Sequence, residues 1–357
     1  MGIKYLNKYL QANCSKSIKQ ISLNDLRDKK IVIDTSIYLY RFLGENALLE
    51  NFYLMISLFL EYNIIPLFVF DGKPPKEKND LLQKRKNDKK EAEMKYKELE
   101  TRLLDVSDTS EEEKKEMRDN MESLKKEFVR VHHTDIENVK LLIQSYGVSY
   151  IEAPGEADKL CAKMVCKNKA YACLSEDMDL FVYGCNRVLR YISLLKRTVI
   201  MYDLKNMLVD LNLTMDEFQS ICIVSGTDYN IDNENDTSLL KTVKYFKKYK
   251  QSDKLDFYEW LCDNTTYIKN ISDLYEIQAM FNLTNMPEYK QYENLKILNG
   301  PINKSNLKLN QSSLKLNQIR VQREFFACHT LCRCSHSILE LFLKVIKNVN
   351  NHYNIYR

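Results

Sequence analysis

Seven acidic residues stand at places along the sequence where a parallel sheet would bring them together. Two of them end short apolar runs, at residues 31–34 and 67–71, and the others fall after later apolar segments. The set is Asp34, Asp71, Glu156, Asp158, Asp177, Asp179 and Asp228. Because the carboxyl ends of parallel strands share one edge of an α/β sheet, we expect these side chains to meet there.

Seven carboxylates in one crevice would raise one another's pKa values unless cations neutralised them. Oxygen donors without a matching His or Cys set favour a hard divalent ion such as Mg²⁺ or Mn²⁺ over zinc. Two such ions about 4 Å apart could polarise a phosphodiester, supply hydroxide and stabilise the leaving oxygen. The alternative is that each acid is a helix N-cap or turn residue, but capping does not require acids to follow successive strands.

Composition excludes several classes of protein. The 357 residues are 45% hydrophobic with a net charge of +4, so a sizeable core is possible and any electrostatic binding needs local patches. Only 8 residues are glycine, and no glycine-rich phosphate-loop motif is present. The amino terminus lacks a signal-peptide core, Leu6 breaks the myristoylation motif, and no apolar run could span a membrane. We therefore expect an intracellular protein whose ten cysteines are free thiols.

The apolar pattern predicts an α/β fold. Continuous apolar runs at 31–34 and 67–71, with a helix at 48–62 between them, indicate a right-handed βαβ unit and a mostly parallel sheet. Residues 76–130 hold 16 basic and 16 acidic residues and no glycine, which predicts one or two long solvated helices. Helices are expected at 136–146, 215–224 and 337–349, and strands at 148–151, 170–174 and 188–192, with a linker at 299–318.

The segments around the acids resemble the flap endonuclease group of structure-specific 5′ nucleases. The matching strings, in family order between residues 1 and 228, are MGI, VIDTSIYLYRF, FVFDGKPP, EAPGEADKLCA, SEDMDLFVYG and SGTDY. The resemblance implies a PIN-like nuclease fold with a helical arch, and the seven acids as ligands of two Mg²⁺ ions, for which Mn²⁺ could substitute. The Lys- and Asn-rich composition is most similar to poxvirus-type members, which would place the chain in the host cytoplasm; a cellular origin would place it in the nucleus.

The resemblance also assigns contacts to DNA. It places Lys78 and Arg85 at the base of the arch, where their spacing of seven puts both on one helix face within reach of the scissile phosphate. Without the family, both would count as part of a solvated charged face. Tyr40 matches an aromatic residue that stacks on the base beside the cut, or is a core tyrosine. Gly2 matches a glycine that lies against the nucleic acid.

Other features of the carboxyl half are open or depart from the family. Lys241, Lys244 and Lys248, at helical spacing, either hold duplex phosphates or form a solvated face. Residues 43–63 are shorter than in cellular flap endonucleases, which puts strict double-flap selection in question, and residues 230–236 lack the glycines of a cation-binding hairpin. The segment 318–326 is out of register for sliding-clamp binding, which we do not expect. Five residues of unusual spacing leave zinc binding open: Cys328, His329, Cys332, Cys334 and His336.

The sequence thus predicts three parts and one leading function. The parts are a nuclease core at 1–240 (1–75, the arch 76–130, and 131–240), a helical duplex-binding part at 241–298, and a linker with a last helix at 299–357. The leading function is Mg²⁺-dependent cutting of 5′ flaps or branched DNA with a single-stranded 5′ arm, in replication, recombination and repair. The alternatives are a junction-binding recombination scaffold and an RNA-directed 5′ exonuclease. No membrane partner is expected, and the oligomeric state is open.

Overall fold

The computed structural model describes residues 2–105, 111–230 and 238–301, apart from positions 255, 269, 285, 293 and 296. Four sequence predictions therefore lie outside the described residues: nearly all of the linker, the last helix, the clamp-like segment and the Cys/His cluster. Most of the glycine-free loop at 230–236 also lies outside them.

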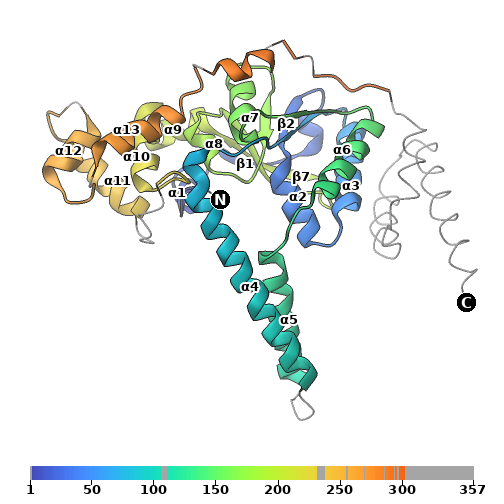
Figure 1. Cartoon of the computed structure of the whole chain (residues 1–357). Helices are drawn as coiled ribbons and strands as arrows, with labels where there is room; N and C mark the ends of the chain where they lie inside the picture. Colours follow the sequence, from blue (N-terminus) through green and yellow to red (C-terminus); the bar gives the residue numbers. More distant parts are fainter. Residues whose placement is uncertain are drawn as a thin grey trace, which may run out of the picture.

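A seven-stranded sheet runs through the centre of the molecule in the order β1-β7-β6-β5-β2-β3-β4 (Figure 1). Five neighbouring strands are parallel: β6 (Arg187–Ser193), β5 (Ala172–Leu174), β2 (Lys30–Asp34), β3 (Ile65–Phe70) and β4 (Ser149–Glu152). At one edge β7 (Thr198–Asp203) and β1 (Ile18–Ser22) add antiparallel pairings that the sequence pattern did not predict. The prediction of a mostly parallel α/β sheet is confirmed.

Both faces of the sheet are buried, which explains the continuous apolar runs of its central strands. On β2, Ile31 and Ile33 pack into one core cluster, while Val32 packs into the other. The first cluster lies under α2 (Thr35–Gly44), α3 (Leu48–Glu61) and α6 (His133–Ser145). The second lies under α1 (Leu6–Asn13), α7 (Ala157–Cys166), α8 (Asp179–Val182), α9 (Leu204–Leu211) and α10 (Met215–Ser225).

The charged segment forms a helical hairpin that projects from the body (Figure 1). After the short turn η2 (Lys76–Lys78), α4 (Asn79–Asp105) runs outward and α5 (Glu111–Glu127) returns beside it. Where α5 ends beside the middle of α4, the hairpin is held by an edge contact between the rings of Tyr96 and Phe128, 5.4 Å between centroids, and by an Arg130–Glu93 ion pair of 2.6 Å. The segment predicted to form an arch is thus two helices, α4 and α5, that pack against each other.

The remaining described chain is helical. Helices α11 (Ser238–Tyr249) and α13 (Ile271–Met280) pack on α10, and α12 (Phe257–Asn264) lies between them in sequence. A last turn, η3 (Pro287–Tyr292), returns to the neighbourhood of α7. The boundaries predicted for the three parts stay predictions. Among the described helices, none is both long and apolar enough to cross a bilayer.

Candidate metal and nucleic-acid site

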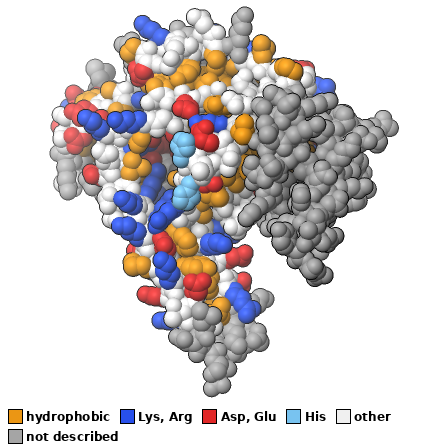
Figure 2. Space-filling model, turned by 45° about the vertical axis from the view of Figure 1, so that its right-hand side comes forward, with side chains coloured by type: hydrophobic (Ala, Val, Ile, Leu, Met, Phe, Trp, Pro, Cys, Tyr) orange, Lys and Arg blue, Asp and Glu red, His pale blue; other side chains and the backbone are white. Residues whose placement is uncertain are grey.

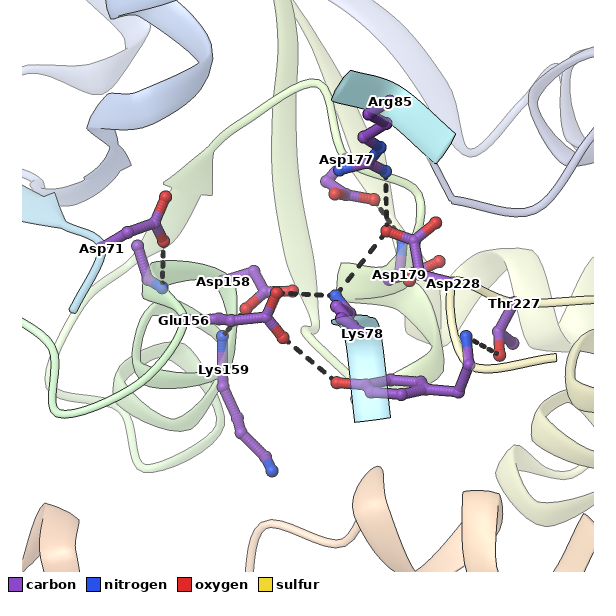
Figure 3. A network of polar contacts seen from close by, with 12 residues as sticks. Asp71, Lys78, Arg85, Glu156, Asp158, Lys159, Asp177, Asp179, Thr227 and Asp228 are labelled. Carbon is purple, nitrogen blue, oxygen red and sulfur yellow. Dashed lines mark hydrogen bonds and ion pairs between the residues drawn. The ribbon is translucent and has the colours of Figure 1, made fainter. Parts of the chain in front are cut away.

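Six of the seven predicted acids lie at the carboxyl edge of the parallel strands or at the start of the helices that follow. Asp34 ends β2, Asp71 follows β3, and Glu156 and Asp158 stand at the start of α7. Asp177 and Asp179 follow β5 in sequence. Asp228 follows the end of helix α10. Figure 3 shows six of these side chains facing a common space. The gathering expected from the strand pattern is present.

Backbone and hydroxyl donors hold the acids in place. Ser175 donates a 2.9 Å hydrogen bond from Oγ to Asp34, and the same oxygen accepts from the amide of Asp177 at 3.1 Å. The amide of Ala157 donates to Oδ1 of Asp71 at 2.8 Å. The loops that carry these acids are thereby tied to one another across the sheet edge.

Gly72 allows two of the acid-bearing loops to touch. Its amide donates a 2.7 Å hydrogen bond to the carbonyl of Gly155, and a Cβ at position 72 would lie 2.0 Å from the carbonyl oxygen of Ala153. Only glycine permits so close a backbone approach. The contact brings the residue after Asp71 against the loop that leads to Glu156.

The acids differ in burial and therefore in pKa. Asp34, Asp158 and Asp179 are buried, whereas Asp71 is exposed. Burial, followed by repulsion from neighbouring carboxylates, raises the pKa of each of the three buried acids well above its usual value. A hydrogen bond from Ser175 opposes this effect at Asp34. The negative charges of the three buried acids are therefore not fully balanced by nearby positive charge.

Two basic side chains from the base of the hairpin supply part of that charge (Figure 3). Lys78, 5% exposed, donates a 2.7 Å hydrogen bond to Oε1 of Glu156 and lies 3.6 Å from Oδ2 of Asp228. Arg85 lies 3.0 Å from the same oxygen of Asp228. Burial alone would lower the pKa of Lys78, but Asp158 and Glu156 outweigh it and hold the pKa above its ordinary value. Lys78 belongs to η2 and Arg85 to α4, so the prediction of one shared helix is wrong, although both reach the acids.

Gly2 lies directly against the acids. A Cβ at this position would stand 2.5 Å from Oδ1 of Asp179 and 2.9 Å from Oδ1 of Asp177, and the φ angle of +76° also favours glycine. The glycine is therefore required by a contact within the protein, whereas the sequence analysis expected a contact with nucleic acid. That second contact stays a prediction.

The donor set fits a hard divalent cation in its chemistry. All seven groups offer oxygen ligands, and three are buried with raised pKa values. Oδ1 of Asp179 is buried and has no hydrogen-bond partner among the described residues. As the side chains stand, however, no group of three or more His, Cys, Asp or Glu residues in the described part of the chain is arranged to hold an ion. In this arrangement two of the seven acids, Glu156 and Asp228, are paired with Lys78 and Arg85.

Arg190, which the sequence pattern did not single out, holds the loop of Asp177 and Asp179. Arg190, buried in β6, donates to the carbonyl of Glu176 at 2.9 Å and lies 3.6 Å from its carboxylate, while its other arm donates to Asn7 at 2.7 Å. The pairing register of β6 shifts after Arg190, and Tyr191 has a left-handed backbone with a φ angle of +55°. As a result, the amide of Tyr191 donates a hydrogen bond to the carboxylate of Glu176. An arginine within an apolar strand was the available signal.

The other predicted DNA contacts are spread over the surface. Tyr40, on α2, is 47% exposed and is therefore not a core tyrosine. The ammonium of Lys89 lies 4.5 Å from the centre of its ring. Lys241, Lys244 and Lys248 are exposed on α11, and none lies among the acids. A pocket of about 280 Å³ opens between the amino terminus, α4 and α10, and Gly2, Arg85 and Asp228 line it.

Comparison with known proteins identifies the family. The XPG N-terminal domain model matches residues 1–92, and the XPG I-region model matches residues 147–228. Flap endonuclease 1-B of Physcomitrium patens is 34% identical over 248 residues, which cover 64% of this chain and 67% of that protein. The chain belongs to the flap endonuclease family. Flap endonuclease 1 of Zea mays is 35% identical over the same length, and there the match spans 62% of the relative.

Two solved structures share the fold of this family member. The catalytic core of Rad2 in complex with a DNA substrate has a TM-score of 0.59 at 20% identity, covering 87% of this chain and 93% of that chain. Human GEN1 in complex with Holliday junction DNA has a TM-score of 0.56 at 16% identity, covering 91% and 77%. Both support the PIN-like nuclease fold that the motif resemblance implied.

Proposed function

We propose that this chain is a divalent-cation-dependent nuclease that cuts flapped or branched DNA near the junction of its arms. One observation carries the proposal: at the edge of the parallel sheet Lys78 and Arg85 from the hairpin pair with Glu156 and Asp228, and four further acids lie beside them (Figure 3). Membership of the flap endonuclease family supports the same activity. Roles in replication, recombination and repair, as well as a viral origin and a compartment, stay predictions from sequence.

The seven acids would hold the cations, and bound divalent cations would supply Lewis acidity toward the phosphate and its attacking water. The protein's own contribution is to hold the acid-bearing loops in fixed positions relative to one another. The loops of Asp71 and Glu156 are joined through Gly72 and Gly155, and the loop of Asp177 and Asp179 is fixed by Arg190. Whether two ions bind, and whether Mn²⁺ substitutes for Mg²⁺, belongs to this proposal.

Lys78 and Arg85 are the side chains best placed to receive the scissile phosphate. Both are now paired with carboxylates that a cation would neutralise, so cation binding would leave their charges available to a phosphate oxygen. Tyr40 would stack on the base next to the cut. Lysine and arginine side chains gather over the upper hairpin and its junction with the body, where a DNA backbone could lie (Figure 2).

Cleavage of a 5′-end-labelled flap duplex tests the proposal. We expect a cut near the junction with Mg²⁺ and none with chelator, leaving a 5′-phosphate and a 3′-hydroxyl. Asp179→Asn should abolish cutting, whereas Asp216→Asn, an exposed acid in the first turn of α10, should not. Lys78→Ala and Arg85→Ala should slow cutting more than they weaken DNA binding; an equal loss of both would remove their catalytic role.

The same assay separates the competing functions. DNA affinity without turnover at any divalent-ion concentration would favour a junction-binding scaffold, which the proposal excludes. Preferential cutting of an RNA version of the substrate would favour an RNA-directed 5′ exonuclease. A panel of flap, nick, splayed-arm and four-way junction DNAs, with mapped cleavage positions, would define the preferred structure.

A further inference from the structure

A second cavity, of about 320 Å³, lies beside helix α7 and shares no lining residue with the pocket next to the acids. One wall is a single face of α7, marked by Lys163 and Lys167, one helical turn apart. The opposite wall is made by two aromatic residues of η3, Tyr289 and Tyr292. Lys169 and Asn294 complete its polar lining.

The lining of this cavity is basic. Three lysines and no acidic residue line it among the described positions. Lys163 is only 6% exposed, and its ammonium forms no ion pair and no hydrogen bond with the described residues. The Lys163 ammonium lies 5.6 Å from the ring centre of Tyr289, a cation–π contact that stabilises its charge. Three ammonium groups around one cavity, with no acidic side chain among its described lining residues, favour an anion there.

The aromatic wall adds a second requirement. The rings of Tyr289 and Tyr292 lie 6.4 Å apart, and Tyr289 is buried while Tyr292 is partly exposed. The hydroxyl of Tyr292 donates a 2.7 Å hydrogen bond to the carbonyl of Glu152, which fixes the ring at the cavity wall. A fixed tyrosine beside lysines suits a ligand that has both a flat ring and an anionic group.

We propose that this cavity binds a single nucleotide, with its phosphate at Lys163 and Lys169 and its base against Tyr292. The volume lies at the small end of ligand pockets, about 300–1,000 Å³, which suits one nucleotide better than a longer segment. The same chemistry could come from a free mononucleotide or from the end of a nucleic-acid strand. The site does not depend on the nuclease activity, since none of the seven acids lines it.

The cavity lies directly behind an acid-bearing loop. Glu152, whose carbonyl receives the Tyr292 hydroxyl, begins the loop that leads to Glu156, and a Cβ on Gly155 would lie 3.5 Å from the Tyr289 hydroxyl. Helix α7 has Asp158 in its first turn and Lys163 in its last. A nucleotide in the cavity would therefore contact the same helix and turn that support two of the acids.

Calorimetric titration of the full chain with deoxyadenosine 5′-monophosphate, in chelator, tests the proposal. We expect saturable binding with a Kd below about 1 mM, and binding at least tenfold weaker for deoxyadenosine and for inorganic phosphate. Lys163→Met and the surface variant Lys169→Gln should each raise the Kd about tenfold or more. Lys205→Met, an exposed lysine of α9, should leave it unchanged. Arg85→Met should also leave it unchanged, because Arg85 belongs to the other pocket.

Several results would overturn the proposal. They are an absence of saturable binding, equal Kd values for Lys163→Met and the parent protein, or loss of binding in Arg85→Met instead. Displacement of the nucleotide by hexaglutamate at equal or lower concentration would show that the cavity takes acidic peptides. Oligonucleotides with a 5′-phosphate or a 5′-hydroxyl, used as competitors, distinguish a strand end from a free nucleotide as the source of the ligand.

Discussion

The ammonium of Lys78 donates a 2.7 Å hydrogen bond to Oε1 of Glu156, across 78 positions of sequence. Lys78 is buried, and the pair lies beside Asp158, whose pKa is raised by burial and by repulsion from neighbouring carboxylates. The lysine therefore acts as an internal counterion for the candidate metal site. Replacing Lys78 should therefore lower both the free energy of unfolding and the rate of cutting.

We expect Lys78→Met to destabilise the protein in chelator. Removing one partner of a buried ion pair leaves the other charge uncompensated, at a cost of about 3 kcal/mol in the free energy of unfolding. Mg²⁺ should recover part of that loss, so its stabilising effect should be larger in the variant. Lys76→Met, an exposed lysine of the same turn, is the control. Denaturant unfolding with and without Mg²⁺ measures both; equal Mg²⁺ effects in the two variants would contradict the prediction.

Stability of the metal-free protein should fall as the pH rises. The folded state raises the pKa of Asp34, Asp158 and Asp179, so it binds protons more tightly than the unfolded chain. The benefit of protonation is present below about pH 4, the unfolded-state value, and is lost as the pH rises through the raised folded-state values. A divalent cation replaces those protons. The gap in Tm between Mg²⁺ and chelator should therefore widen between pH 5 and pH 8, and a constant gap would argue against cation binding at these acids.

Asp179→Asn should stabilise the metal-free protein. It removes a buried charge that burial and Asp177 disfavour, and an increase of about 1 kcal/mol in the free energy of unfolding is expected. The same variant should lose most of the Mg²⁺-dependent rise in Tm. A drop in stability in chelator would mean that the charge of Asp179 is compensated by groups other than cations.

Gly2→Ala should disturb the acids although it changes one methyl group. The added Cβ would overlap Oδ1 of Asp179 and require a left-handed backbone angle, so we expect weaker Mg²⁺ binding and at least about tenfold slower cutting. Gly44→Ala is a matched control, because a Cβ there meets its nearest neighbour at an ordinary 3.5 Å. Loss of DNA affinity without any change in Mg²⁺ affinity would instead support the nucleic-acid role expected from sequence.

Arg190→Gln should weaken cation binding without touching a predicted ligand. The variant loses the bonds that hold the backbone of Glu176, next to Asp177, and a decrease of about tenfold in Mg²⁺ affinity is expected. Arg187→Gln, on the same strand, serves as the control. Calorimetric titration with Mg²⁺ measures the affinity independently of cutting. A change in Tm without a change in Mg²⁺ affinity would show that Arg190 has a purely structural role.

Much of this arrangement was predictable from sequence because it depends on local pattern. The apolar runs ending in Asp34 and before Asp71 identified two central strands, and strand-end geometry placed six of the seven acids on one edge. The 16 basic and 16 acidic residues of 76–130 indicated solvated helices, which the structure has as α4 and α5. Helix α10 begins with a capping box between Thr214 and Glu217, a signal of equally short range.

The tertiary structure alone decided which distant groups became partners. Antiparallel pairing of β1 with β7 joins segments about 180 residues apart, and the pattern within either segment does not indicate the other as its partner. The pairings of Lys78 with Glu156, Arg190 with Glu176 and Gly2 with Asp179 depend on how loops cross at the sheet edge. The cavity at Lys163 exists because η3 returns to α7 from more than 120 residues away. Hydrophobic periodicity specifies which face of a strand or helix is buried, but side-chain partners are selected by packing between elements, which no single stretch of sequence contains.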